Sequence, residues 1–203
     1  MKNKDNLVWM DLEMTGLDPE SCTILEACVV ITDRHLNLIE IGPSIAIHHS
    51  DKILASMEPW SKAHHKKSGL TEECRASKIN LKKAETIIQK FVKTYCAKKS
   101  SPLCGNSIWQ DRRFLAKYMP KLEQYLHYRV IDVSSVKELV SRWYPENYKM
   151  PDTKTGNHRA MGDVLDSIEE LKYYRSKVFV KTKKLFSKKT TKRITQLRRK
   201  SCY

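Results

Sequence analysis

The sequence predicts a mixed α/β domain in which helices cover a single sheet. Three apolar segments of strand length open the chain, and short strand-like segments then alternate with helix-like ones, an order typical of this class. The chain has 203 residues, of which 40% are hydrophobic, and it contains no internal repeat. This length suits one compact domain with a buried core and a terminal extension.

The first three elements are expected to be strands. Residues 7–14 form an apolar run that ends in a polar edge, and a turn at 15–19 follows. Residues 24–32 form an apolar run of strand length. Residues 38–48 contain four isoleucines and predict a third strand, which residues 33–37 join to the second as a hairpin.

Helices dominate the rest of the chain. Between residues 84 and 95 the apolar side chains recur at spacings of 3-1-3-1-3, which predicts one stripe of an amphipathic helix. Residues 111–119 predict a helix that Pro120 ends. A final helix is expected from Met161 to Leu171 or Tyr174.

Two short strands are expected between these helices. Residues 102–105 form the first, which ends at a glycine, and residues 130–133 form the second. Ser134 is the expected N-cap of a helix that continues to Tyr144.

Basic side chains are concentrated at the C terminus. The net charge is +15, and 13 of the 38 Lys and Arg residues follow Glu170, after which no acidic residue occurs. The first 170 residues therefore hold 25 basic and 23 acidic side chains and are nearly neutral. We expect residues 1–180 to form the folded domain and 181–203 to form a flexible basic extension. This extension either attracts polyanions through counterion release or is a solvated tail.

Cysteines and apolar runs exclude several classes. The six cysteines include no CxxC pair and no His partner at zinc-finger spacing, so structural zinc is not expected. Cys28 and Cys104 lie inside apolar runs and are expected in the core. No apolar run approaches the roughly 20 residues of a membrane helix, and the N terminus lacks the apolar segment of a signal peptide. We expect a cytoplasmic protein without a membrane partner.

Four acids and one histidine form a candidate metal-dependent site. Asp11 and Glu13 are two residues apart and share one face of the first strand. Burying such a pair is costly unless cations neutralise it, and oxygen ligands suit hard ions such as Mg²⁺; a solvent-exposed strand end is the alternative. Asp111 stands near the start of a helix that follows a strand, and His158 and Asp163 stand at the front of the last helix. Together they supply the carboxylates and the base that two-metal phosphoryl hydrolysis requires.

The order and spacing of these residues resemble the DEDDh exonuclease superfamily. Three longer strings are similar to the oligoribonuclease family within it: WMDLEMTGL at 9–17, GNSI and QDRRFL between 105 and 115, and HYR with DVS between 127 and 134. The resemblance covers residues 7 to about 178. Trp109 departs from the small residue typical of that position, and the basic tail exceeds the usual family length.

The resemblance implies a ribonuclease H-like fold and a 3′-to-5′ exoribonuclease. Its substrates would be short RNAs, especially dinucleotides, and its products nucleoside 5′-monophosphates. It also implies two divalent cations, Mg²⁺ or Mn²⁺. Asp11 would bridge both, with Glu13 and Asp163 completing one site and Asp111 the other. His158 would be the general base, for which imidazole is suited by its ordinary pKa of about 6.5.

The resemblance also implies substrate contacts. Leu17 would be a wedge between the substrate's bases, and Trp60 and His65 would line the base and phosphate pocket. Burial of Trp60 against the core is the alternative, and His64 could take the place of His65. Ser107, Arg129 and Ser134 would grip the 5′ phosphate, and Tyr128 would approach from the second subunit of a homodimer and assist the chemistry. Tyr128 and Arg129 could instead be ordinary surface residues.

Two other functions share parts of this pattern. A proofreading or tRNA-trimming exonuclease has the same metal ligands but lacks the HYR string and the context of Ser107. A catalytically inactive exonuclease fold that holds RNA through its tail is the second alternative. The presence of all five catalytic residue types argues against it, because losing one acid is enough to inactivate such a site.

Overall fold

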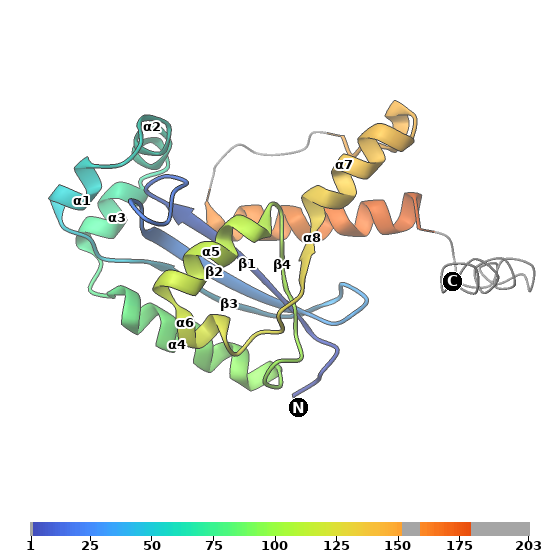
Figure 1. Ribbon diagram of the computed structural model, residues 1–203, viewed down its shortest axis with the longest axis horizontal. Coiled ribbons are helices and arrows are strands. Elements are labelled where there is room, and N and C mark those ends of the chain that lie inside the picture. Colours follow the sequence, from blue (N-terminus) through green and yellow to red (C-terminus); the bar gives the residue numbers. More distant parts are fainter. Residues whose placement is uncertain (1, 152–158, 180–203) are drawn as a thin grey trace, which may run out of the picture.

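Five strands of the protein form one mixed sheet in the order β3-β2-β1-β4-β5 (Figure 1). The structure is a computed structural model that describes residues 2–151 and 159–179. The strands are β1 (Leu7–Met14), β2 (Ile24–Thr32), β3 (Leu38–Ala46), β4 (Leu103–Gly105) and β5 (Val130–Asp132). β1 pairs antiparallel with β2, and β2 with β3, whereas β4 and β5 run parallel to β1. The predicted mixed sheet flanked by helices is confirmed.

Helices connect and cover the strands. In the described ranges they are α1 (Asp51–Ala55), α2 (Pro59–Lys67), α3 (Leu70–Ala76), α4 (Leu81–Tyr95), α5 (Ile108–Tyr118), α6 (Pro120–Glu123), α7 (Val133–Trp143), the 3-10 turn η1 (Glu146–Tyr148) and α8 (Ala160–Lys177). No helix in the part of the chain that the structure describes is long and apolar enough to cross a membrane.

The side chains of β1 alternate between two hydrophobic clusters. Val8, Met10 and Leu12 pack with α4, α5 and α6 on one face of the sheet. Leu7 and Trp9 pack with α7 and α8 on the other face, where the Trp9 indole Nε1 donates a hydrogen bond to Thr32 Oγ1 at 2.9 Å. Because side chains alternate along a strand, the next residues of the second series, Asp11 and Glu13, belong to the α8 face.

A third cluster lies at the end of the sheet toward which β1 points. Leu54, Leu70 and Cys74, from the α1–α3 segment, are buried against Leu25 of β2. Figure 1 shows α1–α3 gathered at this end, near the start of α8. These three helices were not predicted from the sequence; α2 carries His65, which lies near Glu13, and α3 carries Glu73, which binds Arg159.

Several predicted boundaries are wrong. The helix predicted from Asp111 begins at Ile108, after Ser107 adopts a left-handed backbone with φ 48°. Ser134 is not the cap of α7; Asp132 is, because its side chain accepts a hydrogen bond from the Ser134 N–H at 2.9 Å. The third strand ends at Ala46 rather than at residue 48. The core positions of Cys28 and Cys104 are confirmed. Residues 181–203, predicted to be a flexible extension, lie outside the described residues.

Candidate active site

Three acidic side chains converge at the C-terminal end of β1. Asp11 and Glu13 come from β1 and Asp163 from the first turn of α8, and one carboxylate oxygen of each lies within 4.8 Å of the others. All three are partly buried. The structure thus brings together three of the four acids that the sequence suggested as metal ligands.

The fourth acid, Asp111, is buried in the first turn of α5. Its Oδ1 accepts a hydrogen bond at 2.9 Å from the backbone N–H of Leu12, the residue between Asp11 and Glu13. This bond anchors α5 to the same short stretch of β1. The fourth carboxylate therefore lies near Asp11 and Glu13, which it repels.

The electrostatics of this cluster favour binding of cations. Burial, followed by repulsion from Asp111, Glu13 and Asp163, raises the pKa of Asp11 well above its ordinary 3.8. Burial and then the charges of Asp163 and Glu26 raise the pKa of Glu13 to about 8. Burial raises the pKa of Asp111 to about 7. Several carboxylates that repel one another in a partly buried place are an oxygen-donor set that suits hard divalent ions.

The turn after β1 holds Leu17 out in solvent. The Leu17 side chain is 65% exposed, whereas its backbone is fixed at both ends. Its N–H donates to Glu58 Oε1 at 3.4 Å, and its carbonyl accepts a hydrogen bond from the side-chain amide of Gln110. A Cβ at Gly16 would clash with the Glu58 side chain, so only glycine permits this close approach. An exposed apolar side chain on a fixed backbone suits a contact with a ligand.

Helix α2 carries the aromatic residues predicted to line the site. Trp60 is 60% exposed and stacks on His64 with 3.8 Å between ring centroids, so burial of Trp60 against the core is wrong. His65 is buried, and its Nε2 lies 2.9 Å from the Met14 carbonyl oxygen. Its Nδ1 lies 3.9 Å from Glu13 Oε2. His65 therefore contacts the acidic cluster, whereas His64 packs beneath the exposed tryptophan.

Ser107 and Ser134 come together after the ends of β4 and β5. The Ser107 N–H donates to Ser134 Oγ at 2.9 Å, and the two hydroxyl oxygens lie 3.2 Å apart. Ser134 Oγ donates to Asn106 Oδ1 at 3.0 Å. Left-handed backbone is unfavourable for a residue other than glycine, and such strain is often found at functional sites. The pair is thus a preformed hydroxyl cluster on the C-terminal side of the sheet.

Tyr128 and Arg129 lie at the opposite end of β5. They precede Val130, whereas Asp132 and Ser134 follow the strand, and three residues of strand span roughly 10 Å. Tyr128 is 72% exposed, its ring stacks on His127 with 4.6 Å between centroids, and the Arg129 guanidinium lies 5.3 Å from the Tyr128 ring. Within one chain, the structure does not bring Arg129 to the two serines.

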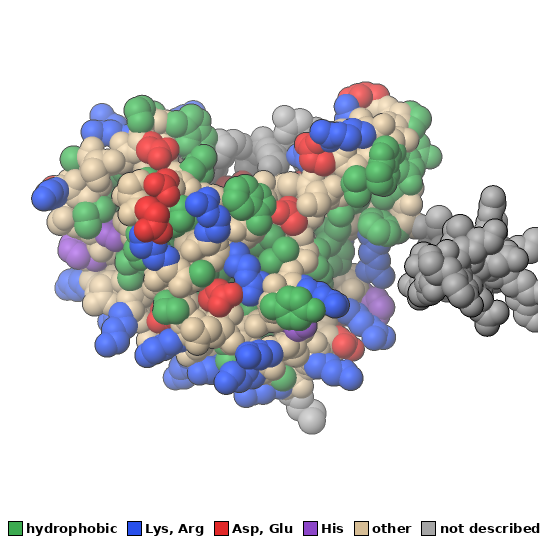
Figure 2. Space-filling view, viewed as in Figure 1, with side chains coloured by type: hydrophobic (Ala, Val, Ile, Leu, Met, Phe, Trp, Pro, Cys, Tyr) green, Lys and Arg blue, Asp and Glu red, His purple; other side chains and the backbone are tan. Residues whose placement is uncertain are grey.

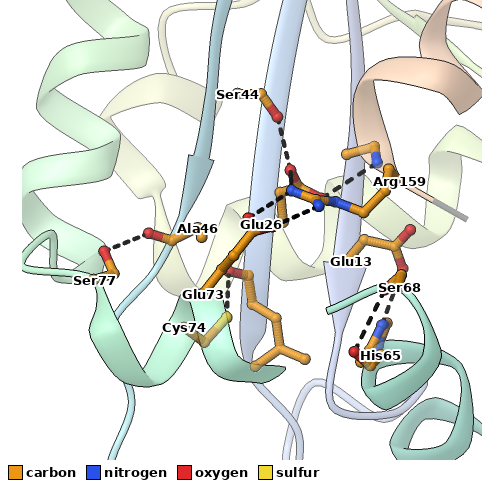
Figure 3. A network of polar contacts seen from close by, with 12 residues as sticks. Glu13, Glu26, Ser44, Ala46, His65, Ser68, Glu73, Cys74, Ser77 and Arg159 are labelled. Carbon is orange, nitrogen blue, oxygen red and sulfur yellow. Dashed lines mark hydrogen bonds and ion pairs between the residues drawn. The ribbon is translucent and has the colours of Figure 1, made fainter. Parts of the chain in front are cut away.

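His158, the expected general base, lies outside the described residues. Glu26, which the sequence analysis did not single out, is a buried acid bound by Arg159 next to Glu13 (Figure 3). The sequence did contain a signal for Glu26: an acid inside the apolar run at 24–32 is expected to be buried, and a buried carboxylate requires a partner. Glu58 and Gln110, which fix Leu17, had no such signal.

Comparisons with known sequences identify a family and several relatives. A family model described as Exonuclease matches residues 8–171. An oligoribonuclease of Dichelobacter nodosus is 50% identical over 180 residues, which cover 89% of this chain and 98% of the relative. An oligoribonuclease of Shewanella oneidensis is 53% identical over 178 residues, covering 86% and 96%. A probable oligoribonuclease of Dictyostelium discoideum is 53% identical over 173 residues, covering 85% and 90%.

Solved structures agree at the level of the fold. An apo exonuclease I superposes with a TM-score of 0.65 at 18% identity, covering 87% of this chain and 43% of that protein. Escherichia coli exonuclease I in complex with a dT13 oligonucleotide superposes with a TM-score of 0.68 at 17% identity, covering 85% and 41%. This chain therefore spans less than half of those larger proteins, and the likeness concerns architecture alone.

Proposed function

The chain belongs to the oligoribonuclease family of exonucleases and is an exoribonuclease, and from this premise we propose that it cuts short RNAs, above all dinucleotides, from the 3′ end into nucleoside 5′-monophosphates. The observation that carries the proposal is the meeting of Asp11, Glu13 and Asp163 within 4.8 Å, with Asp111 anchored to the same strand. Four acids of that geometry suit phosphodiester hydrolysis assisted by divalent cations.

We propose two divalent cations, Mg²⁺ or Mn²⁺, as the cofactors. Asp11 would contact both, Glu13 and Asp163 would complete one set of ligands, and Asp111 would belong to the other. Bound cations stabilise negative charge on the attacking and leaving oxygens of a phosphodiester. The raised pKa values support this assignment, because the four carboxylates ionise together only with difficulty unless cations are present.

His158 is proposed to remove the proton from the attacking water. It directly precedes Arg159, whose side chain and backbone are held at the start of α8, and it stands five residues before Asp163. Neutral imidazole accepts a proton near neutral pH, and it can pass that proton to solvent. Water attack at the 3′-terminal phosphodiester then releases a nucleoside 5′-monophosphate and leaves a new 3′ hydroxyl.

Leu17, Trp60 and His65 are proposed to hold the substrate. The fixed backbone and free side chain of Leu17 suit insertion between two bases, and the exposed face of Trp60 suits stacking on one of them. Stacking of this kind is worth about 1–3 kcal/mol per base and tolerates any base. His65 would support Glu13 and the adjoining phosphate pocket, because it is buried against Glu13.

A cap over the 5′ phosphate would limit substrate length. The Ser107 hydroxyl would donate a hydrogen bond to the phosphate, and the Ser134 hydroxyl would do so after turning away from Asn106 Oδ1. Tyr128 would come from the second subunit of a homodimer, and the position of Arg129 at the same end of β5 suggests that Arg129 does so too. Leu139 and Trp143 of α7 are 43% and 70% exposed, and Figure 2 shows hydrophobic side chains gathered over α7. Such exposed apolar area supports contact with a second copy.

The decisive experiment is product analysis on 5′-labelled RNAs of two to twenty nucleotides, with Mg²⁺, Mn²⁺ or chelator. The proposal requires cation-dependent release of nucleoside 5′-monophosphates from the 3′ end, with dinucleotides cut fastest per encounter. Equal efficiency on dinucleotides and 20-mers would contradict the cap. It would favour an exonuclease of broader length range.

We propose that residues 1–180 form the catalytic domain and that 181–203 strengthen salt-sensitive binding to longer RNA, since the charge is concentrated there. A dinucleotide offers too few phosphates to engage this tail. A cytoplasmic location stays a prediction from the sequence.

A further inference from the structure

Glu26 is a buried acid that lies beside the acidic cluster of Asp11, Glu13 and Asp163 but is not part of it. It is 1% exposed, and it is the direct cross-strand partner of Glu13 in the β1–β2 ladder. Like charges directly opposite one another destabilise an antiparallel pair. A buried carboxylate at this position must therefore be neutralised, and Figure 3 shows that Arg159 does so.

Arg159 holds two carboxylates from two different elements. Its Nε and Nη2 donate to the two oxygens of Glu26 on β2, each at 3.0 Å. Its Nη1 and Nη2 donate to the two oxygens of Glu73 on α3, at 2.8 and 2.7 Å. Ser44 on β3 donates a further hydrogen bond to Glu26 at 2.8 Å. The planar guanidinium is suited to such paired bonds, which the ammonium of lysine cannot reproduce.

The same arginine is the N-cap residue of α8. Its backbone carbonyl accepts a hydrogen bond from the Asp163 N–H at 3.2 Å, and the N–H of Ala160 lies 3.4 Å from Glu26 Oε2. The position of the first turn of α8 therefore depends on the ion pairs of Arg159. Asp163, the ligand that α8 contributes, lies in that turn.

We propose that Arg159 is a positioning residue for the metal site, fastening the first turn of α8 to β2 and α3 so that Asp163 meets Asp11 and Glu13. Its pairing with Glu26 also keeps that carboxylate occupied, so that Glu26 does not compete for the cations. This inference rests on the proposed metal site. Outer partners that orient metal ligands typically change metal affinity by about 10- to 100-fold when they are removed.

The test measures Mn²⁺ binding to purified protein by titration calorimetry, independently of turnover. The double variant Glu26→Gln with Arg159→Met removes the fastening without leaving an unpaired buried charge. We expect its Mn²⁺ dissociation constant to rise at least about tenfold, and Arg159→Lys to fall between the double variant and the wild type. Arg75→Met is the matched control, because Arg75 also bridges two carboxylates, Asp51 and Glu72, but has no contact with α8 among its hydrogen bonds and ion pairs in the described chain. Its dissociation constant should stay within twofold of wild type.

A second pair of variants covers the case in which the double variant does not fold. Glu73→Gln weakens one side of the fastening while the buried Glu26 pair remains, whereas the neighbouring Glu72→Gln affects only Arg75. Mn²⁺ binding that is weaker than wild type in Glu73→Gln but unchanged in Glu72→Gln supports the inference. Wild-type affinity in both the double variant and Glu73→Gln overturns it, even if the melting temperature without metal falls. Absence of Mn²⁺ binding in the wild type would instead refute the proposed metal site itself.

Discussion

The two ends of β5 differ in how completely one chain builds them. On the C-terminal side, Asp111 is buried and bonded to β1, and Ser107 is bonded to Ser134. On the N-terminal side, Tyr128 is 72% exposed and packs against its chain neighbours His127 and Arg129. Side chains that the chain has already fixed suit the proposed binding of cations and phosphate. Side chains that project into solvent, as Tyr128 does, suit the proposed contact with another subunit's site.

The largest effect on turnover is expected from the four acids and His158, which come from a single chain. Asp11→Ala, Glu13→Ala, Asp111→Ala and Asp163→Ala should each remove nearly all turnover on a dinucleotide. Stabilisation by a catalytic cation is worth several kcal/mol, which corresponds to about three powers of ten in rate. His158→Ala should lower turnover by about 100- to 10,000-fold while leaving Mn²⁺ binding largely intact. Near-normal rates at saturating Mg²⁺ in any one variant would show that its residue is wrongly assigned.

The second prediction tests whether the exposed end serves a partner. His158→Ala and Tyr128→Ala homodimers should both be impaired, because every site lacks one group. After subunit exchange, each heterodimer would contain one site with both groups, so about a quarter of all sites would be intact in a random mixture. Turnover should recover accordingly in a mixing assay. No recovery despite exchange demonstrated by mass spectrometry would place Tyr128 in its own subunit or outside the mechanism.

The third prediction concerns the phosphate grip. Arg129→Ala should weaken binding of a 5′-phosphorylated dinucleotide by about 1.5–3 kcal/mol for each charge-assisted hydrogen bond that is lost. A dinucleotide without the 5′ phosphate should be much less affected, and this comparison is the control. If both ligands lose affinity equally, Arg129 acts on something other than the terminal phosphate.

The fourth prediction follows from the raised pKa values of the cluster. Without metal, the folded protein keeps protons on Glu13 and Asp111 that the unfolded chain has already lost, so its stability should fall as pH rises from about 4.5 to about 8. Mg²⁺ takes the place of those protons, so its stabilising effect should grow over the same pH range. Melting temperatures with chelator and with Mg²⁺ measure both trends. The Glu13→Gln variant should show a smaller pH dependence, and a constant Mg²⁺ effect would contradict this account.

The smallest effect is expected from the tail. Removing residues 181–203, which hold 10 of the 38 Lys and Arg residues, should leave dinucleotide turnover nearly unchanged, because two nucleotides offer too few phosphates to engage them. Binding of a 20-mer should weaken, and its dependence on salt should become shallower. A large loss of dinucleotide turnover in a folded truncation would show instead that the tail supports the active site.

Elements with a strong period were predictable from the sequence. The 3-1-3-1-3 spacing between residues 84 and 95 belongs to α4, and the alternation along β1 places Asp11 and Glu13 on one face. Helix α2 lacked such a pattern, because its buried residues are Ser61 and His65 rather than apolar side chains. The sequence could not distinguish Ser134 from Asp132 as the N-cap of α7, because Ser and Asp both suit that position.

The contacts between distant segments were harder to predict. The motifs indicated which acids act together, because their types and spacing match a known family. Nothing in the sequence paired Arg159 with Glu26 and Glu73, which lie on separate elements far from it in the chain. Such pairing depends on the packing of α8 across β2, a tertiary arrangement that local patterns do not encode.

Because its tryptophans differ in burial, the intrinsic fluorescence of the protein should report on folding and on RNA binding separately. Trp9 is fully buried between the sheet and α8, so its emission should shift to longer wavelength only when the domain unfolds. Trp60 is exposed and stacks on the His64 ring, and a base that stacks on it should quench its fluorescence. Single-tryptophan versions that keep Trp9 or Trp60, with the other three replaced by Phe, would separate folding from RNA binding without any attached dye.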